Sequence, residues 1–457
     1  MELSSQIGQL HNLEVLDLDE TQMLFLPKEI GNLSNLKFLR VSFYGYMNCG
    51  KRLQQNPLIN LGTISALFQL TTLSIDVNPD DERWNAVVEA VVEEACSLKR
   101  FIVGQHRQRS ILRVPKEANA QFQKWDKCLK FVKGKDIPSE MKRVLNCTKA
   151  FYLDCHATAR SLCDFGIENM RKLKFCLLVE CNEIQTIISG VESNKEHTNI
   201  LEYGPNSSAS GAGSTTLWSE TQSFTSDRES DEEQDVMLED DPNNSESEGW
   251  SNFAQQAALL NLQYLHIYYL KNLVNIWRTP TNDKQCLPCL KFLRLDMCPK
   301  LSVIFHPTLL ANLGMLEVLI VKDCPEVTTV VSLMTNEFID PQVLYLPSLK
   351  RISLLYLPKL ASISSGVQIA PNLEKVGFYN CPKLESLSTG EMSSRGLEVI
   401  RGESKWWEAL KWNESEWGNR LDYLQSIFCP ITREKDVMTQ MEEISRIPSR
   451  DQTRMVI

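Results

Sequence analysis

The chain lacks any apolar run that approaches the roughly 18 uninterrupted residues of a membrane-spanning helix. Its N-terminus, MELSSQIGQLHNLEVL, lacks the basic segment and the continuous apolar segment of a secretory signal. The sequence therefore predicts neither a membrane span nor export.

Motifs of enzymatic and nucleotide-binding sites are also missing. We find no G-x-x-x-x-G-K-[ST], H-E-x-x-H or G-x-S-x-G, and the six histidines show no metal-ligand spacing. Cys286 and Cys289 form a lone CxxC, whereas a structural zinc usually needs four ligands. Cys155 and His156 are neighbours that would point to opposite faces of a strand, so we interpret them as a core cysteine beside an exposed histidine. We expect no catalytic residue, no cofactor and no metal.

Excess positive charge is absent. The formal net charge is −10, and residues 191–250 alone hold 15 acidic and two basic residues, a local balance of −13. The rest of the chain is thus close to neutral. Because neither part offers a basic stripe that would neutralise phosphates, nucleic-acid binding is not predicted.

Leucine, in contrast, recurs in a ladder of the form L-x-x-L-x-L. The clearest copies begin 24 to 33 residues apart, and they are Leu262/Leu265/Ile267, Leu290/Leu293/Leu295, Leu316/Leu319/Val321, Leu349/Ile352/Leu354 and Leu373/Val376/Phe378. This pattern is the leucine-rich-repeat signature, with a short strand on the concave side of each coil and a variable return segment. It predicts an α/β leucine-rich-repeat solenoid with a parallel concave β-sheet and irregular or helical convex segments.

The cysteines fit the same template. Fourteen are present, and Cys181, Cys298, Cys324 and Cys381 occupy positions where the repeat needs a small buried residue. A large chain without an export signal is expected to keep such thiols reduced. The sequence therefore indicates a cytoplasmic protein, with the nucleus as a second compartment.

The pattern along the chain predicts five segments. They are a first repeat array over 1–188 that is irregular at 105–150, an acidic disordered insert over 189–252, a second array over 253–402, a Trp-rich cap over 403–430 and a polar tail over 431–457. Within the insert, Ser226, Ser230 and Ser245 each precede an acidic residue by three positions, which suits acidophilic kinases.

The residues between the inward-facing leucines are the candidate binding site, because they point to the concave face. Mixed charge and tyrosine on this face favour protein recognition, where aromatic and arginine side chains dominate the energetics. The alternative is an ordinary solvated sheet face. The predicted partner-binding residues are Asp17, Asp19, Arg40, His266, Tyr268, Arg294, Asp296, Lys322, Ser353 and Tyr379.

Several motifs together resemble the repeat region of plant disease-resistance proteins of the coiled-coil nucleotide-binding class. These are LPKEIGNLSNLKFL, the C-P-K-L endings in LKFLRLDMCPKL and LEKVGFYNCPKL, GIENMRKLKFCLLVECNEIQTI and the closing GESKWWEALKW. The resemblance covers about 1–190 and 250–430.

The resemblance implies the recognition region of an intracellular immune receptor. Its repeats would sense a pathogen effector or a modified host protein and would contact a nucleotide-binding module in cis or in trans. No residue of this sequence matches that module, so we expect a truncated receptor or one without its nucleotide-binding switch.

Two other functions remain open. Repeats of this kind also present substrates in ubiquitin-ligase adaptors, although no F-box-like helix pair precedes Leu13. An extracellular receptor domain is the other alternative, for which the N-x-S/T sequons carry little weight without a signal peptide.

Overall fold

The computed structural model describes residues 2–43, 57–105, 114–189, 258–278, 286–332, 346–392, 394, 396–412, 417–418, 420–432 and 435–446. Residues 1–190 and 255–457 form one compact unit. All statements below concern the described residues of this unit.

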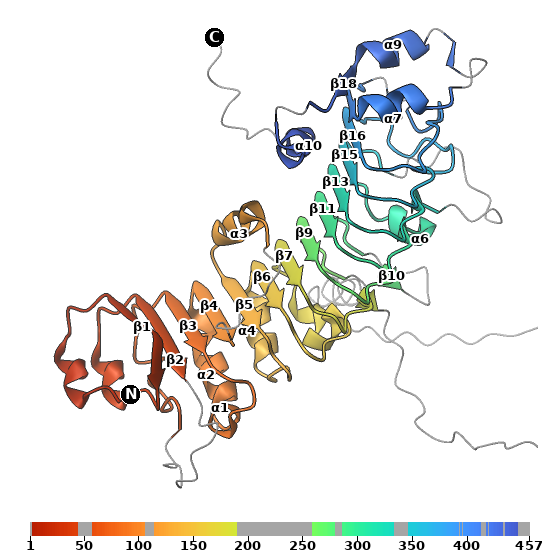
Figure 1. The fold of residues 1–457 in the computed structure, drawn as a ribbon. Coiled ribbons are helices and arrows are strands. Elements are labelled where there is room, and N and C mark those ends of the chain that lie inside the picture. The colour runs from red at the N-terminus through yellow and green to blue at the C-terminus, as the bar shows by residue number, and fades with distance from the viewer. Residues whose placement is uncertain are drawn as a thin grey trace, which may run out of the picture. The chain divides into compact units, whose positions relative to one another are not determined.

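One parallel sheet of 14 strands organises the unit, and its strands follow each other in chain order (Figure 1). The strands are β1 (Val15–Met23), β2 (Phe38–Phe43), β3 (Thr72–Asp76), β4 (Arg100–Gly104), β5 (Cys128–Val132), β6 (Ala150–Asp154), β7 (Phe175–Val179), β9 (Tyr264–Tyr268), β11 (Phe292–Asp296), β13 (Val318–Lys322), β15 (Arg351–Leu355), β16 (Lys375–Tyr379), β17 (Val399–Gly402) and β18 (Phe428–Pro430). Each strand contributes one rung, as a leucine-rich-repeat solenoid requires.

The leucine ladder forms the core. Leu265 pairs with Leu293, and Leu293 pairs with Leu319, so equivalent residues of successive coils lie side by side. All three are fully buried, as are the leading leucines Leu262 and Leu290. A fully buried Leu contributes about 1.5–3 kcal/mol, so every coil depends on its neighbours for stability. The predicted leucine-rich-repeat fold is confirmed.

A left-handed residue ends most strands. Tyr269, Met297, Asp323 and Tyr356 follow β9, β11, β13 and β15 with φ between 51° and 61°. Such a conformation costs a side-chain-bearing residue on the order of 1 kcal/mol. In each case its N–H donates to the last carbonyl of the next strand, as from Met297 to Lys322 at 2.9 Å. This bond holds the turn that directs the chain back into the core.

Cysteines next to this turn are hydrogen-bond donors as well as core residues. The Sγ of Cys324 donates to the carbonyl of Lys322 at 3.3 Å, and that of Cys181 donates to Val179 at 3.3 Å. Burial raises the pKa of Cys181 and Cys381 to about 12, so both thiols stay protonated. None of the cysteines that the structure describes is in a disulfide.

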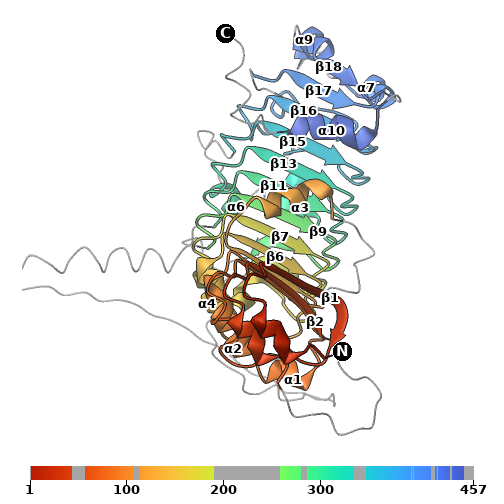
Figure 2. The same ribbon diagram turned by 90° about the vertical axis from the view of Figure 1, so that its left-hand side faces the viewer.

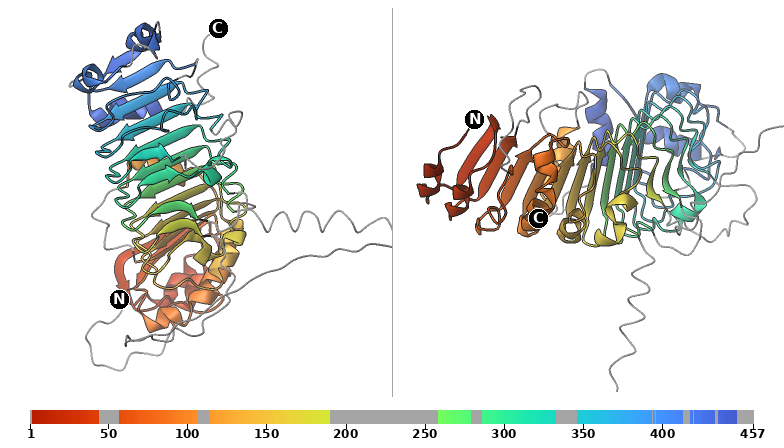
Figure 3. Two further views of the ribbon diagram at one scale, coloured as in Figure 1. Left: turned by 90° about the vertical axis from the view of Figure 1, so that its right-hand side faces the viewer. Right: turned by 90° about the horizontal axis from the view of Figure 1, so that it is seen from below.

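The return segments all lie on one side of the sheet, the side of the leucine core (Figure 3). They carry the short helices α1 (Glu82–Asn85), α2 (Val88–Glu94), α4 (Met141–Cys147) and α6 (Pro307–Leu310), together with 3-10 turns at Ser5–Gln9, Lys28–Asn32, Ala95–Ser97, Leu162–Phe165 and Ile167–Asn169. Two additional pairs, β8 (Thr186–Ser189) with β10 (Asn275–Arg278) and β12 (Val303–Phe305) with β14 (Thr329–Val331), add short parallel ladders.

The stretch 105–150, where we expected irregular structure, also contains repeats. Its strand β5 places Leu129 and Phe131 in the core, and α4 buries Leu145. The leading position of the ladder is Asp126 instead of leucine, which explains why the pattern was weak.

The two predicted arrays share one sheet, because β7 pairs directly with β9. Cys176 lies opposite Leu265 and Leu178 lies opposite Ile267. The acidic segment between them lies outside the described residues, together with Ser226, Ser230 and Ser245.

The Trp-rich segment packs on the last coils. It contains α7 (Ser404–Ala409) and α9 (Arg420–Ser426). Trp406 contacts Phe378 at a ring distance of 5.0 Å and donates from Nε1 to the carbonyl of Leu384 at 2.9 Å. Trp407 stacks on Phe428 of β18 at 4.3 Å. These contacts cover apolar surface at the end of the sheet, as a cap would.

Two helices lie on the sheet face that bears the residues between the leucines, which we call the outer face. They are α3 (Lys116–Gln123), which contacts β6 and β7, and α10 (Val437–Ser445), which contacts β13, β15 and β16 (Figures 1 and 2). α10 falls in the stretch where we expected a polar tail without packing. Its apolar residues Met441 and Ile444 are three positions apart and both are buried, a signal too short to stand out among the polar neighbours.

Replacing Gly104 with alanine should destabilise the first coils. Gly104 has φ +116°, and a Cβ there would lie 1.8 Å from the carbonyl oxygen of Val132. We expect a loss of about 2 kcal/mol or more in unfolding free energy, seen as a lower thermal midpoint. Gly314→Ala is the matched control, because a Cβ at Gly314 meets nothing within 4 Å. Equal midpoints for the two variants would contradict the close approach of Gly104, at the end of β4, to the carbonyl of Val132.

Candidate functional site

The in-register strands arrange the outer-face residues in rows. The middle row runs Asp17, Arg40, Ser74, Ile102, Lys130, Tyr152, Leu177, His266, Arg294, Ile320, Ser353, Gly377 and Arg401 across successive strands. The sheet thus brings the ten predicted partner-binding residues to one face, but it divides them into three groups.

The first group is exposed and ion-paired. Arg40 lies 3.2 Å from Asp17 and 3.6 Å from Asp19, and all three side chains are more than a third exposed. Exposed pairs of this kind contribute at most about 1 kcal/mol to stability.

The second group is buried, although we expected these residues to face solvent. Tyr268 is 1% exposed, Asp296 3%, His266 4% and Arg294 7%. The reason is their position between and beneath α3 and α10, two elements that the leucine periodicity does not reveal. Lys322 lies at the edge of the same group and is half-buried.

Charge in the second group is partly compensated. Arg294 Nη2 lies 3.3 Å from Asp296 Oδ2, and Lys322 Nζ lies 3.9 Å from the same oxygen. The Arg294 guanidinium also lies 5.5 Å from the centre of the Tyr268 ring. Burial raises the pKa of Asp296, while the two cations oppose that rise.

His266 lies in an aromatic stack. Its ring is 4.8 Å from Phe292 and 5.1 Å from Phe175. Burial, with a smaller contribution from Arg294, lowers the pKa of His266 to about 3. The imidazole is therefore neutral at physiological pH.

Several buried polar atoms of the second group have no hydrogen-bond partner among the residues that the structure describes. They are both ring nitrogens of His266, the Tyr268 hydroxyl, Arg294 Nε and Asp296 Oδ1. Native structures leave few such atoms, and each one unpaired costs about 1–3 kcal/mol. A concentration of them in one place is typical of a binding site.

Helix α3 closes one side of this site with an apolar cluster. Phe122 packs edge-to-face on Tyr152 at 5.6 Å and contacts Phe175 at 6.1 Å. Trp125, just after the helix, contacts Tyr264 at 6.3 Å. A second core on the outer face results, separate from the leucine core.

A groove of about 620 Å³ lies between α3 and α10. Its floor consists of outer-face residues of β9, β11 and β13, and its walls carry charge of both signs, namely Glu117 and Lys124 from the α3 side and Glu442 and Arg446 from the α10 side. The floor residues are Tyr264, His266, Tyr268, Phe292, Arg294 and Ile320. Aromatic residues and a buried arginine at the base of a groove are the usual anchors of a protein interface.

The third group lies at α10. The Oγ of Ser353 is 2.8 Å from the Oγ of Ser445, so this predicted residue is covered by the helix. Tyr379 is half-buried and packs edge-to-face on Tyr356 at 5.2 Å.

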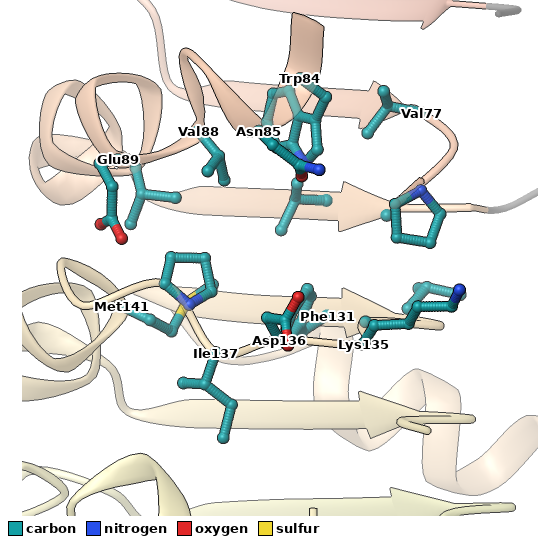
Figure 4. A pocket seen from close by; sticks show the side chains of 17 residues that line it. Val77, Trp84, Asn85, Val88, Glu89, Phe131, Lys135, Asp136, Ile137 and Met141 are labelled. Atoms are coloured by element: carbon teal, nitrogen blue, oxygen red, sulfur yellow. The ribbon is translucent and has the colours of Figure 1, made fainter. Parts of the chain in front are cut away.

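A smaller cavity of about 340 Å³ lies between the return segments that follow β3 and β5, away from the predicted residues. Trp84 and Val88 line it from one coil, and Ile137 and Met141 line it from a later one (Figure 4). Its Glu89 carboxylate already accepts hydrogen bonds from the backbone N–H groups of 139 and 140, at 2.8 and 2.9 Å. We regard it as a packing gap.

The interpretation of Cys155 and His156 was wrong. His156 is 2% exposed, whereas Cys155 is half-buried. Cys155 takes the left-handed position after β6, with φ 53°, so strand alternation no longer applies. His156 then occupies the inward position of the repeat cysteine and packs 5.3 Å from Phe131.

Among the described residues, no three His, Cys, Asp or Glu side chains gather in a way that would hold a metal ion. No helix in the part of the chain that the structure describes has the length and apolar character needed to cross a bilayer.

Sequence reasoning missed the walls of the groove. Phe122 and Trp125 follow the spacing of a short amphipathic helix, but that stretch was assigned no regular structure. The α10 residues Glu442 and Ser445 fell in the supposed tail.

Comparison with known proteins identifies the class of repeat. Residues 234–325 and 271–395 match the family described as "Plant disease resistance protein RPS2-like, leucine-rich repeats". The resemblance predicted from the sequence is thereby confirmed for the repeats between residues 234 and 395, and leucine-rich repeats are protein-interaction modules. No curated protein sequence matches the chain.

Two solved structures are similar to this chain at low identity. A leucine-rich-repeat protein of Leptospira interrogans, LIC12759, has 15% identity and a TM-score of 0.41, with 94% of this chain and 88% of that chain covered. The leucine-rich-repeat domain of the type III effector XCV3220 (XopL) has 12% identity and a TM-score of 0.33, with 76% and 96% covered.

His266→Phe should weaken the acid sensitivity of the fold. The unfolded imidazole binds a proton as pH falls through about 6.5, whereas the folded one, with a pKa of about 3, does not. Folding therefore loses stability below about pH 6.5, by about 2 kcal/mol at pH 5 for such a histidine. Thermal midpoints measured at pH 7 and pH 5 should differ less in the variant than in the unmodified protein. Equal pH dependence in both would argue against a neutral, buried His266.

Proposed function

We propose that this chain is the protein-recognition part of a plant intracellular immune receptor. In this proposal it senses a pathogen effector or a modified host protein on the outer face of its sheet, without catalysis, in the cytoplasm or the nucleus. The observation that carries the proposal is the groove between α3 and α10, with its aromatic and arginine floor.

Physical chemistry supports a protein ligand at this place. A partner side chain that enters the groove would contact Tyr264 and Phe292, which are half-buried, and would approach the unpaired polar atoms of His266 and Arg294. Burial of aromatic surface and pairing of desolvated polar atoms are the two largest contributions at interface centres. The exposed pairs around Arg40 would contribute specificity more than affinity.

Site-specific photo-crosslinking tests the proposal. A photoreactive phenylalanine analogue replaces Tyr264 in the groove or, as control, Phe68, which is 74% exposed in a return segment. In challenged plant tissue, we expect one pathogen-encoded or modified host protein to crosslink at position 264 and not at 68. Crosslinking of that same protein from position 68 alone would show that the outer face is not the recognition surface.

A groove variant provides a quantitative check with the protein so identified. Tyr264→Ala should weaken its binding by about tenfold or more, because interface aromatics often account for more than 1 kcal/mol each. Phe68→Ala, at an exposed position in a return segment, is the matched control and should change binding little.

A further inference from the structure

Helix α10 fills a trough in the outer face whose floor consists of small residues. Ser353 and Gly377 are neighbours in the middle row. A Cβ on Gly377 would lie 2.7 Å from Met441 Cε and 3.5 Å from Ile444 Cγ1, so the missing side chain makes the space that the helix occupies. Ser445 meets Ser353 at the floor, with 2.8 Å between the hydroxyl oxygens.

Arginines stand at both ends of this trough. Arg294 lies two strands before Ser353, and Arg401 lies one strand after Gly377. The helix presents consecutive glutamates that are divided between them. Arg401 Nη1 lies 2.7 Å from Glu443 Oε2, and this bond lowers the pKa of Glu443. Glu442 lines the groove together with Arg294 and Glu117. Burial and the nearby Glu117 carboxylate raise the pKa of Glu442, and the charge of Arg294 opposes that rise.

The trough therefore fits the side-chain pattern of α10. It accepts two large apolar side chains three positions apart, Met441 and Ile444, and an acidic pair between them. Amphipathic helices dock into grooves of other proteins through apolar side chains that are spaced in this way. Small floor residues, apolar contacts and the Arg401–Glu443 ion pair are more than a helix on the surface needs in order to be accommodated.

The helix α10 is only weakly stabilised in its position. It has nine residues, a length at which an isolated helix is marginal in water, so its helicity depends on the trough. Outside the trough, Gln440 ties it to the preceding segment by hydrogen bonds to Thr432 and Lys435, at 2.8 and 2.9 Å. Asp436 caps its first turn through the N–H of Thr439 at 3.0 Å.

We propose that this trough is a helix-binding socket, that α10 occupies it in cis, and that an amphipathic helix with an acidic pair, supplied by a partner protein, displaces α10. Displacement would also move Glu442 and Ser445 and so open one wall of the adjoining groove. The proposal rests on the proposed function only in treating the outer face as a recognition surface.

A labelled peptide of residues 435–446, KDVMTQMEEISR, tests the socket. The full chain with Met441→Asp and Ile444→Asp leaves the floor intact but removes the apolar contacts of α10. We expect the peptide to bind this variant at least about tenfold more tightly than the unmodified chain, because the cis helix competes for the site there. Fluorescence anisotropy measures both affinities.

Two matched variants define where the peptide binds. Adding Gly377→Leu to the same chain should abolish binding, since the new side chain would occupy the position of Met441. Arg401→Glu should weaken binding of the peptide. A peptide that carries Glu443→Arg should regain affinity for the Arg401→Glu chain and for no other. Undiminished binding to the Gly377→Leu chain, or no binding to a folded Met441→Asp/Ile444→Asp chain, would overturn the socket.

Hydrogen exchange of the unmodified chain gives an answer that does not depend on variants. Amides of 437–445 should exchange at least about a hundredfold faster than those of β15 and β16, because a displaceable helix opens without the sheet. Equal protection of the helix and the strands would overturn displacement. The crosslink at position 264 is scored separately, so failure of the socket leaves the proposed recognition surface untouched, and the reverse also holds.

Discussion

The structure depends on one constraint: apolar side chains of each coil must stack in register on those of the next. Leu265, Leu293 and Leu319 satisfy it in three consecutive strands. Because side chains alternate along a strand, that stacking also forces His266, Arg294 and Ile320 side by side on the other face. The outer face is thus a by-product of core packing, and its composition can vary while its geometry cannot.

The outer face is not one uniform surface. Around Arg40 it is open and its charges are paired. Further along, α3 adds a second apolar core and α10 fills the trough over Gly377, with the groove between the two helices. Buried side chains such as Tyr268 and Arg294 are then confined by their neighbours. Preorganisation of this kind reduces the entropy lost on binding.

Periodicity predicted the sheet well, because the leucines that form the sequence pattern are also the buried residues that stabilise the sheet. It predicted which residues share the outer face, such as Arg294 and Tyr268, for the same reason. It did not predict their burial, since they lie between α3 and α10, two helices of eight and nine residues that are far away in the sequence. Alternation also failed at Cys155, where a left-handed residue interrupts the strand geometry.

The pairing of β7 with β9 has a consequence for how a leucine-rich-repeat sequence diversifies. These strands are joined in full register even though the chain between them runs from Glu180 to Gln263. Loop-closure entropy rises only with the logarithm of length, by about 0.6 kcal/mol per doubling. A lineage can therefore lengthen or rewrite a return segment at little cost to folding, while a single-residue insertion within a strand would turn the outer-face rows into the core. Variation of length and variation of the outer face are inherited through different parts of each repeat.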